Sequence, residues 1–473
     1  MKNKIICILI CVMILFVAVI ANSLNITENN RYHQHMANKK QVKTDDVEEF
    51  NTHLPIVTID TDGQDIPGEY RDGITIISNI SIYDDETKNN YLSDVPKLKT
   101  KSTIRTRGNS SIHFDKKGYL LKFINEDGSE NKQKVMGMDS YDEWILNGPF
   151  LDKTLLRNYM WYNIAGEIMD YAPNVRYCEV FINNEYKGVY IMLESIARSD
   201  YGRIPISKYE EGKNYTGYIV RIDRGSRHEI QNLNSLVKYA KLADEDSYID
   251  IIYPPRTQLN DKIKNYIERD MSTFEKSLYS FDYDEEEYGY DNYINTESFV
   301  DYFIINEFTQ NYDAGGLSTY LYKDVRGKLN LCVWDYNNCC ANYIEATTLD
   351  RNFELRGKLY YYMLTKDEKF NEKVIERYKE LRKTYLSDEY LMNYINDTIK
   401  YLGDAVERNF EVWGYTFNED YKMLIPQERD LHSYDEAVEQ LKSFIKSRGA
   451  YLDKNIESIL QFSHESAVKM YNH

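Results

Sequence analysis

Cysteine is scarce in this sequence, with six among 473 residues, and no two of them form the CxxC pair that structural zinc sites use. The eight histidines stand singly, and no His/Cys spacing typical of a metal site occurs. The GxSxG pattern of serine hydrolases is also absent. These absences argue against a disulfide scaffold, a structural zinc site and the common hydrolases, so the core must be held together by burial.

Basic runs are missing as well. Lys and Arg total 58 against 76 for Asp and Glu, which gives a formal net charge of −18. Because such a field repels phosphate backbones, it disfavours nucleic-acid binding as the main function. Two interpretations of the acidic charge stay open: it attracts basic partners, or it only keeps the protein soluble.

The composition that is present belongs to a globular chain with more than one lobe. Hydrophobic residues make up 42% and charged residues 28%, a balance that argues against disorder. A chain of 473 residues exceeds one small core, so we expect two lobes or domains. The 44 tyrosines suit half-buried surfaces and wide grooves.

The N-terminal segment predicts export. Two lysines in residues 1–4 precede an apolar run from Ile5 to Ala21, which is about long enough to cross a bilayer. Residues 1–21 are therefore a transmembrane anchor, which we favour, or a signal peptide. Either alternative places the rest of the chain outside the cytoplasm, membrane-anchored or secreted. Residues 22–50 are polar, as expected of a linker.

Strands dominate the first part of the folded region and helices the second. Short β-branched segments predict strands, and apolar side chains at helical spacing predict helices. The predicted strands cover 54–59, 73–77, 119–123, 178–182 and 187–193, and the predicted helices begin near 152 and cover 261–278, 297–310 and most of the chain after 367. This order predicts an α+β fold.

Two aspartates flank one predicted β-hairpin. Its strands cover 319–323 and 329–334, with Asp313 shortly before the first strand and Asp335 directly after the second. A hairpin brings its ends together, so both carboxylates are expected within reach of one ion or substrate. Each aspartate alone also suits a turn. Placed together at one hairpin, they favour a catalytic pair.

Paired aspartates of this kind suit phosphoryl transfer. In protein kinases one Asp orients the attacking hydroxyl or accepts its proton, while another holds magnesium against the nucleotide phosphates. The kinase pattern has a metal-binding Asn five positions after the first Asp, and here that position is Ser318, a weaker ligand. Asp335-Tyr336-Asn337 stands where the magnesium-binding Asp-Phe-Gly normally stands.

Further short motifs follow in a characteristic order. They are Arg107-Gly108-Asn109-Ser110-Ser111, Lys117 with Tyr119-Leu120-Leu121-Lys122, Leu156-Arg157-Asn158, Phe181-Ile182-Asn183 continuing through Gly188-Val189-Tyr190 to Glu194, the strand before Asp324, and Trp334-Asp335-Tyr336. From about residue 56 to residue 453 the chain resembles the CotH family of spore-coat kinases. The resemblance implies a divergent, two-lobed protein-kinase-like fold, with a mainly β N-lobe at 51–200 and a mainly helical C-lobe at 201–465.

The resemblance also implies roles for the aspartates and their neighbours. Asp313 would be the catalytic aspartate and Asp335 the metal-binding one, with Ser318 and Asn337 as further candidate metal-site residues. The family usually continues Trp-Asp-x-Asp, so Asn337 replaces a carboxylate, and hard cations depend on anionic oxygens. A member that has lost turnover is therefore a second expectation.

Nucleotide contacts are implied at the earlier motifs. Lys122 would pair with the phosphates, and Arg107, Asn109 and Ser110 would lie near them. The backbone at Glu194 would meet the adenine. Simpler alternatives stay open, because strand lysines usually point to solvent and a segment with a single glycine such as 107–111 is also an ordinary turn.

The function implied by the resemblance is ATP-dependent phosphorylation, with Mg or Mn, of basic Ser-rich coat or envelope proteins during sporulation. The expected location is the spore coat or the outer forespore surface, with membrane attachment through the N-terminal segment. The alternative is a kinase-like assembly protein of the coat or envelope without turnover.

Overall fold

The computed structural model describes residues 31–37, 49–68, 73–108, 111–197, 203–239, 247–342, 352–418 and 431–465. The predicted anchor or signal peptide at residues 1–21 lies outside these residues, and so do Asn109 and Ser110. None of the described helices combines the length and the apolar character that spanning a bilayer would require. The described residues from Gln34 onward belong to one compact unit.

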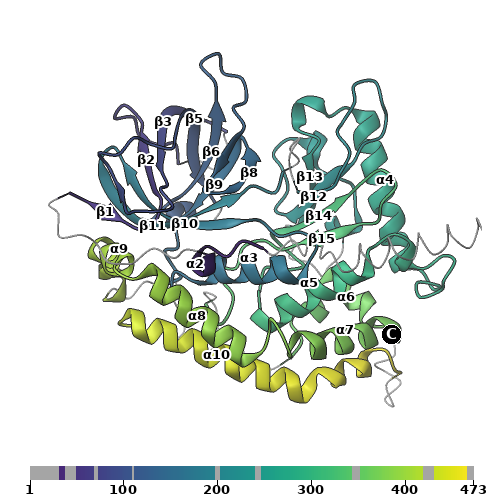
Figure 1. The fold of residues 1–473 in the computed structure, drawn as a ribbon. Coiled ribbons are helices and arrows are strands. Elements are labelled where there is room, and N and C mark those ends of the chain that lie inside the picture. The colour runs from purple at the N-terminus through teal and green to yellow at the C-terminus, as the bar shows by residue number, and fades with distance from the viewer. Residues whose placement is uncertain are drawn as a thin grey trace, which may run out of the picture. The chain divides into compact units, whose positions relative to one another are not determined.

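Seven strands close into a barrel in the order β10-β11-β9-β6-β5-β3-β2 (Figure 1). They are β2 (Ile56–Asp60), β3 (Ile76–Tyr83), β5 (Leu98–Arg107), β6 (Gly118–Ile124), β9 (Glu143–Asn147), β10 (Val175–Ile182) and β11 (Glu185–Glu194). Parallel pairing of β10 with β2 closes the barrel. Alternate side chains such as Ile104, Leu121 and Trp144 fill the interior, so their neighbours face outward.

The hairpin predicted at residues 178–193 is confirmed as β10 and β11. Its two turn residues, Asn183 and Asn184, have φ values of 49° and 65°. Asparagine tolerates this left-handed region, and the resulting turn matches the twist of the flanking strands. The strands predicted at 54–59, 73–77 and 119–123 correspond to β2, β3 and β6, with shifted ends.

A second sheet has the strand order β13-β12-β14-β15. It consists of β12 (Tyr218–Asp223), β13 (Tyr248–Tyr253), β14 (Thr319–Lys323) and β15 (Asn330–Cys332). The antiparallel pair β14–β15 is the predicted hairpin between the two aspartates. The sequence did not indicate β12 and β13, because polar and aromatic residues are mixed between residues 201 and 256 without a clear period.

Helices make up most of the remaining chain. They are α3 (Arg157–Ile168), α4 (Asp261–Leu278), α5 (Thr296–Thr309), α6 (Leu359–Leu364), α7 (Glu368–Leu381), α8 (Asp388–Leu402), α9 (Ala405–Trp413) and α10 (Tyr434–Asn455). The helices predicted at 261–278 and 297–310 are α4 and α5. The described part of the last third is mostly helical, as predicted. The chain therefore has the mixed α+β architecture expected from the sequence.

Helix α3 begins at Arg157, later than the predicted start near Asp152. Asp152 precedes the helix and acts as an acceptor for its first turn, because its Oδ2 accepts the Arg157 N–H at 2.8 Å. Its Oδ1 accepts the Thr154 N–H at 3.1 Å. Aspartate is a common residue at the start of a helix because its carboxylate accepts backbone N–H groups, and this explains why the sequence predicted a start near Asp152.

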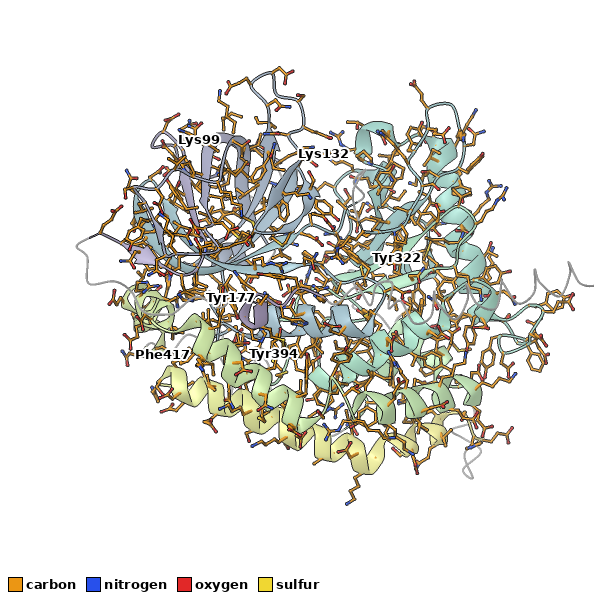
Figure 2. All side chains as sticks on the ribbon, viewed as in Figure 1. Lys99, Lys132, Tyr177, Tyr322, Tyr394 and Phe417 are labelled. Carbon is orange, nitrogen blue, oxygen red and sulfur yellow. The ribbon has the colours of Figure 1, made fainter. Side chains whose placement is uncertain are left out.

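A short helix near the N-terminus, α2 (Gln34–Ala37), packs where a polar linker was predicted. The Gln34 side chain pairs with the Tyr177 backbone, accepting its N–H at 2.7 Å and donating to its carbonyl at 3.2 Å. His35 stacks edge-on against Tyr394, with ring centroids 4.4 Å apart. Tyr177 and Tyr394 lie on opposite sides of α2 in Figure 2. These contacts are polar and aromatic, so they leave no periodic pattern of hydrophobic residues from which the sequence could predict α2.

Candidate active site

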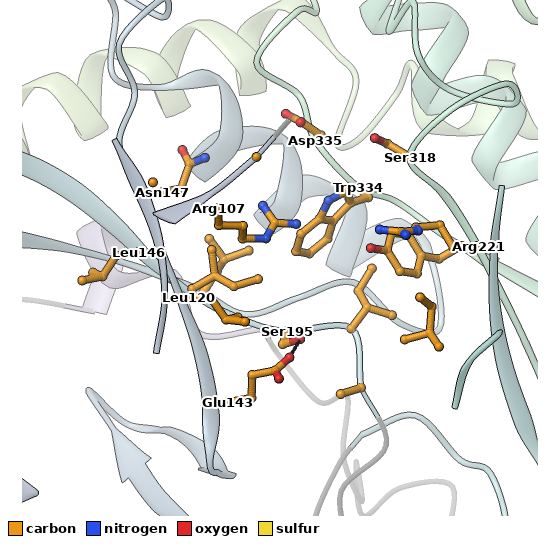
Figure 3. A pocket seen from close by; sticks show the side chains of 18 of the residues that line it. Arg107, Leu120, Glu143, Leu146, Asn147, Ser195, Arg221, Ser318, Trp334 and Asp335 are labelled. Carbon is orange, nitrogen blue, oxygen red and sulfur yellow. Dashed lines mark hydrogen bonds between the residues drawn. The ribbon is translucent and has the colours of Figure 1, made fainter. Parts of the chain in front are cut away.

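A cleft of about 760 Å³ lies between the outer face of the barrel and the four-stranded sheet. The barrel wall is lined by Arg105, Arg107, Leu120, Lys122, Glu143 and Ile145, and the sheet wall by Arg221, Asp223, Ser318, Tyr320, Trp334 and Asp335. Figure 3 shows Asp335 and Ser318 at one end of the cleft, Arg107 in the middle, and Glu143 with Ser195 at the other end.

Strand register orders the barrel wall into rows. Arg107 pairs with Gly118 at the first row, which lies at the Asn147 end of β9. Leu120 pairs with Ile145, which in turn pairs with Leu193, in the second row. Lys122 pairs with Glu143 in the third row. Because a strand rises about 3.3 Å per residue, the first and third rows are separated by about 13 Å.

Asp335 follows β15 in a conformation that few residues with a side chain adopt. Its φ is 56°, in the left-handed region. Two side chains hold its backbone, because the Tyr162 hydroxyl accepts its N–H at 2.8 Å and Asn311 donates to its carbonyl at 3.1 Å. A strained residue that its neighbours fix in this way is typical of a functional site.

Asn158, in the first turn of α3, ties the loop after Asp335 to the barrel. Its Oδ1 accepts the Tyr336 N–H at 2.8 Å. Its Nδ2 donates to Asn337 Oδ1 at 2.6 Å and to Asn147 Oδ1 at 3.1 Å. One carboxamide therefore contacts both walls of the cleft, and with Tyr162 one turn later it fixes where the Asp335 carboxylate lies.

Asp313 lies in the loop after α5 and lines the same end of the cleft. Burial raises the pKa of its carboxyl group to about 6, with a further contribution from the charge of Asp335. Asn338 donates to its Oδ2 at 3.2 Å, which acts in the opposite direction. Its backbone carbonyl also accepts the N–H groups of Gly316 and Leu317. The backbone of Asp313 therefore forms a turn while its carboxylate lines the cleft, and its catalytic role stays a prediction.

The charge balance at this end of the cleft favours a cation. Burial raises the pKa of Asp335 as well, while the N–H of Asn337 and the charge of Arg107 lower it. Among the described residues, neither Asp313 nor Asp335 has a Lys or Arg nitrogen within 4.0 Å. The cations that act on them, Lys358 and Arg224 on Asp313 and Arg107 on Asp335, do so without a direct ion pair. Two neighbouring half-buried carboxylates without a contacting counter-charge are costly when ionised, and a divalent ion would stabilise both.

The described residues supply only part of a metal coordination shell. No group of three or more His, Cys, Asp and Glu side chains is arranged to hold a metal in the described ranges. Magnesium does not need such a group, because it usually binds one or two carboxylates together with water and substrate phosphates. The donor set of Asp313, Asp335 and the Ser318 hydroxyl therefore fits magnesium or manganese bound with a nucleotide.

The family model for the CotH kinase protein matches residues 104–452. The chain belongs to the CotH kinase family. The matched region begins in β5 and ends in α10, so it contains the cleft and both aspartates. The resemblance found in the sequence is thereby confirmed. A comparison with curated proteins finds no match.

The structure brings all four residues predicted at the CotH metal end to the same cleft, and one of them also makes a hydrogen bond that holds the loop. Asp313, Asp335 and Ser318 line the cleft, with Ser318 at a φ of 48°. Asn337 also lines it, but its side-chain oxygen accepts the hydrogen bond from Asn158. In this CotH chain Asn337 therefore helps to position the loop after Asp335, and its predicted role as a metal ligand stays a prediction.

The predicted phosphate-binding residues are divided between the two ends of the cleft. Arg107 is the last residue of β5 rather than part of a turn, and its guanidinium lies 4.8 Å from the centre of the Trp334 ring, beside Asp335. Lys122 is in the third row and pairs at 3.5 Å with both Asp142 and Glu130. The structure does not bring Lys122 to Asp335, whereas it places Arg107 beside Asp335.

Glu194 does not present its side chain to the cleft. Its carboxylate is buried and accepts from Arg203 at 2.6 Å and from the Asn174 N–H at 3.0 Å. The residues on either side of it, Leu193 and Ser195, do line the cleft. The predicted contact of this backbone with adenine stays a prediction. Asn109 and Ser110 lie outside the described residues, but Gly108 and Ser111 line the cleft.

Sequence reasoning missed several residues of the CotH cleft. Asp223 and Arg221 lie on β12, a strand that the sequence did not indicate, and Asp223 raises the pKa of Asp335 through its charge. Asn158 occurs in a quoted motif, but its spacing to Asp335 in the chain gives no sign of their contact. Tyr162 lies in the helix predicted to begin near residue 152, and the sequence gives no sign that its hydroxyl accepts the Asp335 N–H.

Asn158→Ala is expected to lower kcat/KM for phosphate transfer roughly 10- to 100-fold, as is typical when a partner that orients a metal ligand is removed. The magnesium concentration needed for half-maximal rate should rise, because the Asp335 loop loses its anchor. Asn158→Asp keeps the acceptor for the Tyr336 N–H, so its kcat/KM should lie between those of the wild type and Asn158→Ala. Gln258→Ala, which changes a side chain of the same cleft, is the control. A wild-type magnesium dependence in Asn158→Ala would disprove the positioning role.

Proposed function

We propose that this CotH-family chain is an exported protein kinase that uses ATP and Mg or Mn to phosphorylate serines of basic, Ser-rich coat or envelope proteins. The observation that carries the proposal is the pair of half-buried carboxylates of Asp313 and Asp335, both with pKa values raised by desolvation, at one end of a cleft with several arginines. Phosphoryl transfer depends mainly on positioning and charge stabilisation, and this cleft offers both.

The two-lobed arrangement is part of the proposal. In it, the barrel corresponds to the N-lobe within residues 51–200, and the second sheet with helices α4 to α10 to the C-lobe within residues 201–465. The cleft then lies where the two meet, as in kinases. Helix α3 supports this division, because Asn158 contacts Asn147 of the barrel and Asn337 of the aspartate loop.

Each charged side chain has a distinct task. The Asp313 carboxylate orients the acceptor hydroxyl and accepts its proton as the new P–O bond forms. Asp335 and the Ser318 hydroxyl hold the divalent cation, which when bound neutralises the charge of the nucleotide phosphates. Arg107 and Arg221 face the cleft and contribute positive charge to the transferring group. The bond from this group to the nucleotide breaks, and the nucleoside diphosphate leaves.

The proposed basic partner is supported by the net charge and the proposed export by the N-terminal segment, whereas the Ser-rich coat substrate is what membership of the CotH family implies. The net charge of −18 raises the encounter rate with basic proteins. A membrane anchor or signal peptide at residues 1–21 would place the cleft outside the cytoplasm, and the family resemblance implies the spore coat or the outer forespore surface as the location. The direct test is incorporation of phosphate from ATP into a basic, Ser-rich peptide by the full chain with Mg or Mn.

A second function, assembly without turnover, is favoured by one observation. Ser318 and Asn337 replace stronger metal ligands, and the Asn337 oxygen is already engaged by Asn158. Nucleotide binding without phosphate transfer to any basic Ser-rich peptide would support this alternative. Transfer that requires the divalent cation would exclude it.

The kinase rate is expected to rise with pH through the pKa of Asp313, which burial raises to about 6. The protonated carboxyl cannot accept a proton, so kcat/KM should fall about tenfold per pH unit below this pKa and level off above it. The measurement is kcat/KM between about pH 5 and 8. Asp313→Asn should be slower by roughly 10²- to 10⁴-fold and should lack this step. A wild-type profile in Asp313→Asn would assign the titration to another group.

A further inference from the structure

The end of the cleft away from Asp335 has its own chemistry. Leu120, Ile145 and Leu193 stand side by side across three neighbouring strands, as their register shows. All three line the cleft, together with Ile196 and Ile252 from elsewhere in the chain. This apolar surface lies about one row, or roughly 7 Å, beyond the row of Arg107. It offers apolar contact to a flat ring.

A polar row follows the apolar one. Glu143 is the first residue of β9 and pairs with Lys122 of β6. The Ser195 hydroxyl donates a hydrogen bond to Glu143 Oε1 (Figure 3). Glu143 Oε2 makes no hydrogen bond or ion pair within the described part of the chain. Nearby Lys122 is engaged by Asp142 and Glu130 instead.

We propose that Glu143, oriented by Ser195, accepts a hydrogen bond from the exocyclic amino group of the nucleobase. The cleft therefore prefers adenine to a base with a keto group at the same position. The inference rests on the proposed nucleotide-binding function and adds a specificity-determining residue to it. A carboxylate only accepts hydrogen bonds, so it favours an amino group and disfavours a carbonyl oxygen. A nucleotide with its phosphates at Arg107 and Asp335 places its base on the row of Leu120.

The location of Glu143 distinguishes this role from that of an ordinary cross-strand ion pair. A pair that only stabilises β6 against β9 would direct the carboxylate to the opposing Lys122. Here the lysine forms its ion pairs with two other acids and feels Glu143 only as a nearby charge, and within the described residues the hydrogen bond to the Glu143 carboxylate comes from a neutral hydroxyl. The serine leaves the glutamate charge in place and restricts its rotation. Both side chains line the cleft.

The test compares the affinities of ATP and inosine triphosphate, which carries a keto group in place of the amino group, in the presence of magnesium. The wild-type full chain should bind ATP roughly 5- to 100-fold more tightly by calorimetry, the range expected for one discriminated base edge. Glu143→Gln should reduce this ratio to about one or invert it, because the amide N–H can donate to the keto oxygen. Ser195→Ala should reduce the ratio less.

A matched control separates the base from the phosphates. Arg107→Ala should weaken both nucleotides by the same factor and leave their ratio unchanged. Equal affinity of the wild type for the two nucleotides, or an unchanged ratio in Glu143→Gln, would overturn the role of Glu143 while the kinase proposal stands. Absence of binding of either nucleotide to the wild type would overturn both. The near-isosteric Gln replacement should leave the melting temperature unchanged.

Discussion

Asp335→Asn is expected to abolish phosphate transfer, with a loss of at least about 10²- to 10³-fold in kcat. The substitution keeps the size and most of the hydrogen bonds of the side chain but removes one of the two charges that attract the divalent cation. Its N–H bond to Tyr162 and its carbonyl bond from Asn311 are made by the backbone, so the loop should keep its conformation. The measurement is phosphate incorporation at saturating ATP and magnesium.

The control for Asp335→Asn is Asp142→Asn. Asp142 also lines the cleft, but it pairs with Lys122 at 3.5 Å in the row farthest from the aspartate loop. It should keep nearly the wild-type rate, because it touches neither cation nor phosphates. Equal rates in Asp335→Asn and the wild type would remove Asp335 from the mechanism. An inactive wild type that still binds ATP would instead favour the assembly function.

The part of the site carried by one hairpin was predictable from sequence. Asp313 and Asp335 flank two strands joined by a short turn, and such a hairpin brings its ends together whatever surrounds it. The strand and helix periods predicted the α+β architecture for a similar reason, since they record which faces are buried. The local sequence pattern was sufficient to predict contacts between residues that are close in the chain.

The contacts between distant segments were not predictable. Asn158 is 179 positions from Asn337, yet their side chains are 2.6 Å apart. Lys122 was assigned to the phosphates from the resemblance to CotH proteins, but the position of a residue along a barrel strand depends on register with β9, which no local signal reveals. The position of the Asp223 carboxylate in the cleft is set by β12, and the mixed polar and aromatic composition of this segment gave no sign of a strand. Side-chain chemistry was visible in the sequence, whereas the partners depend on the packing of the whole chain.

A buried ion pair beneath the aspartate loop is expected to have the largest effect on stability. Arg157 and Asp152 are each 2% exposed, and their side chains are joined at 2.6 Å. The same guanidinium donates to the carbonyls of Cys339 at 3.0 Å and Cys340 at 3.2 Å, four and five positions after Asp335. Arg157 therefore links the start of α3 to the segment that continues from the aspartate loop.

Arg157→Met should lower the free energy of unfolding by about 3–5 kcal/mol, because it leaves the Asp152 carboxylate buried without its cation and removes the guanidinium donor from the carbonyls of Cys339 and Cys340, of which the second keeps a weaker bond from Gln440. Chemical denaturation of the full chain measures the change. Adding Asp152→Asn to Arg157→Met should recover part of the loss, since it removes the unpaired charge. Lys88→Met, which breaks an ion pair whose lysine is 52% exposed, should lower the free energy of unfolding only slightly. A loss as small as this in Arg157→Met would show that water or a rearranged loop satisfies Asp152, and that the aspartate loop does not depend on this ion pair.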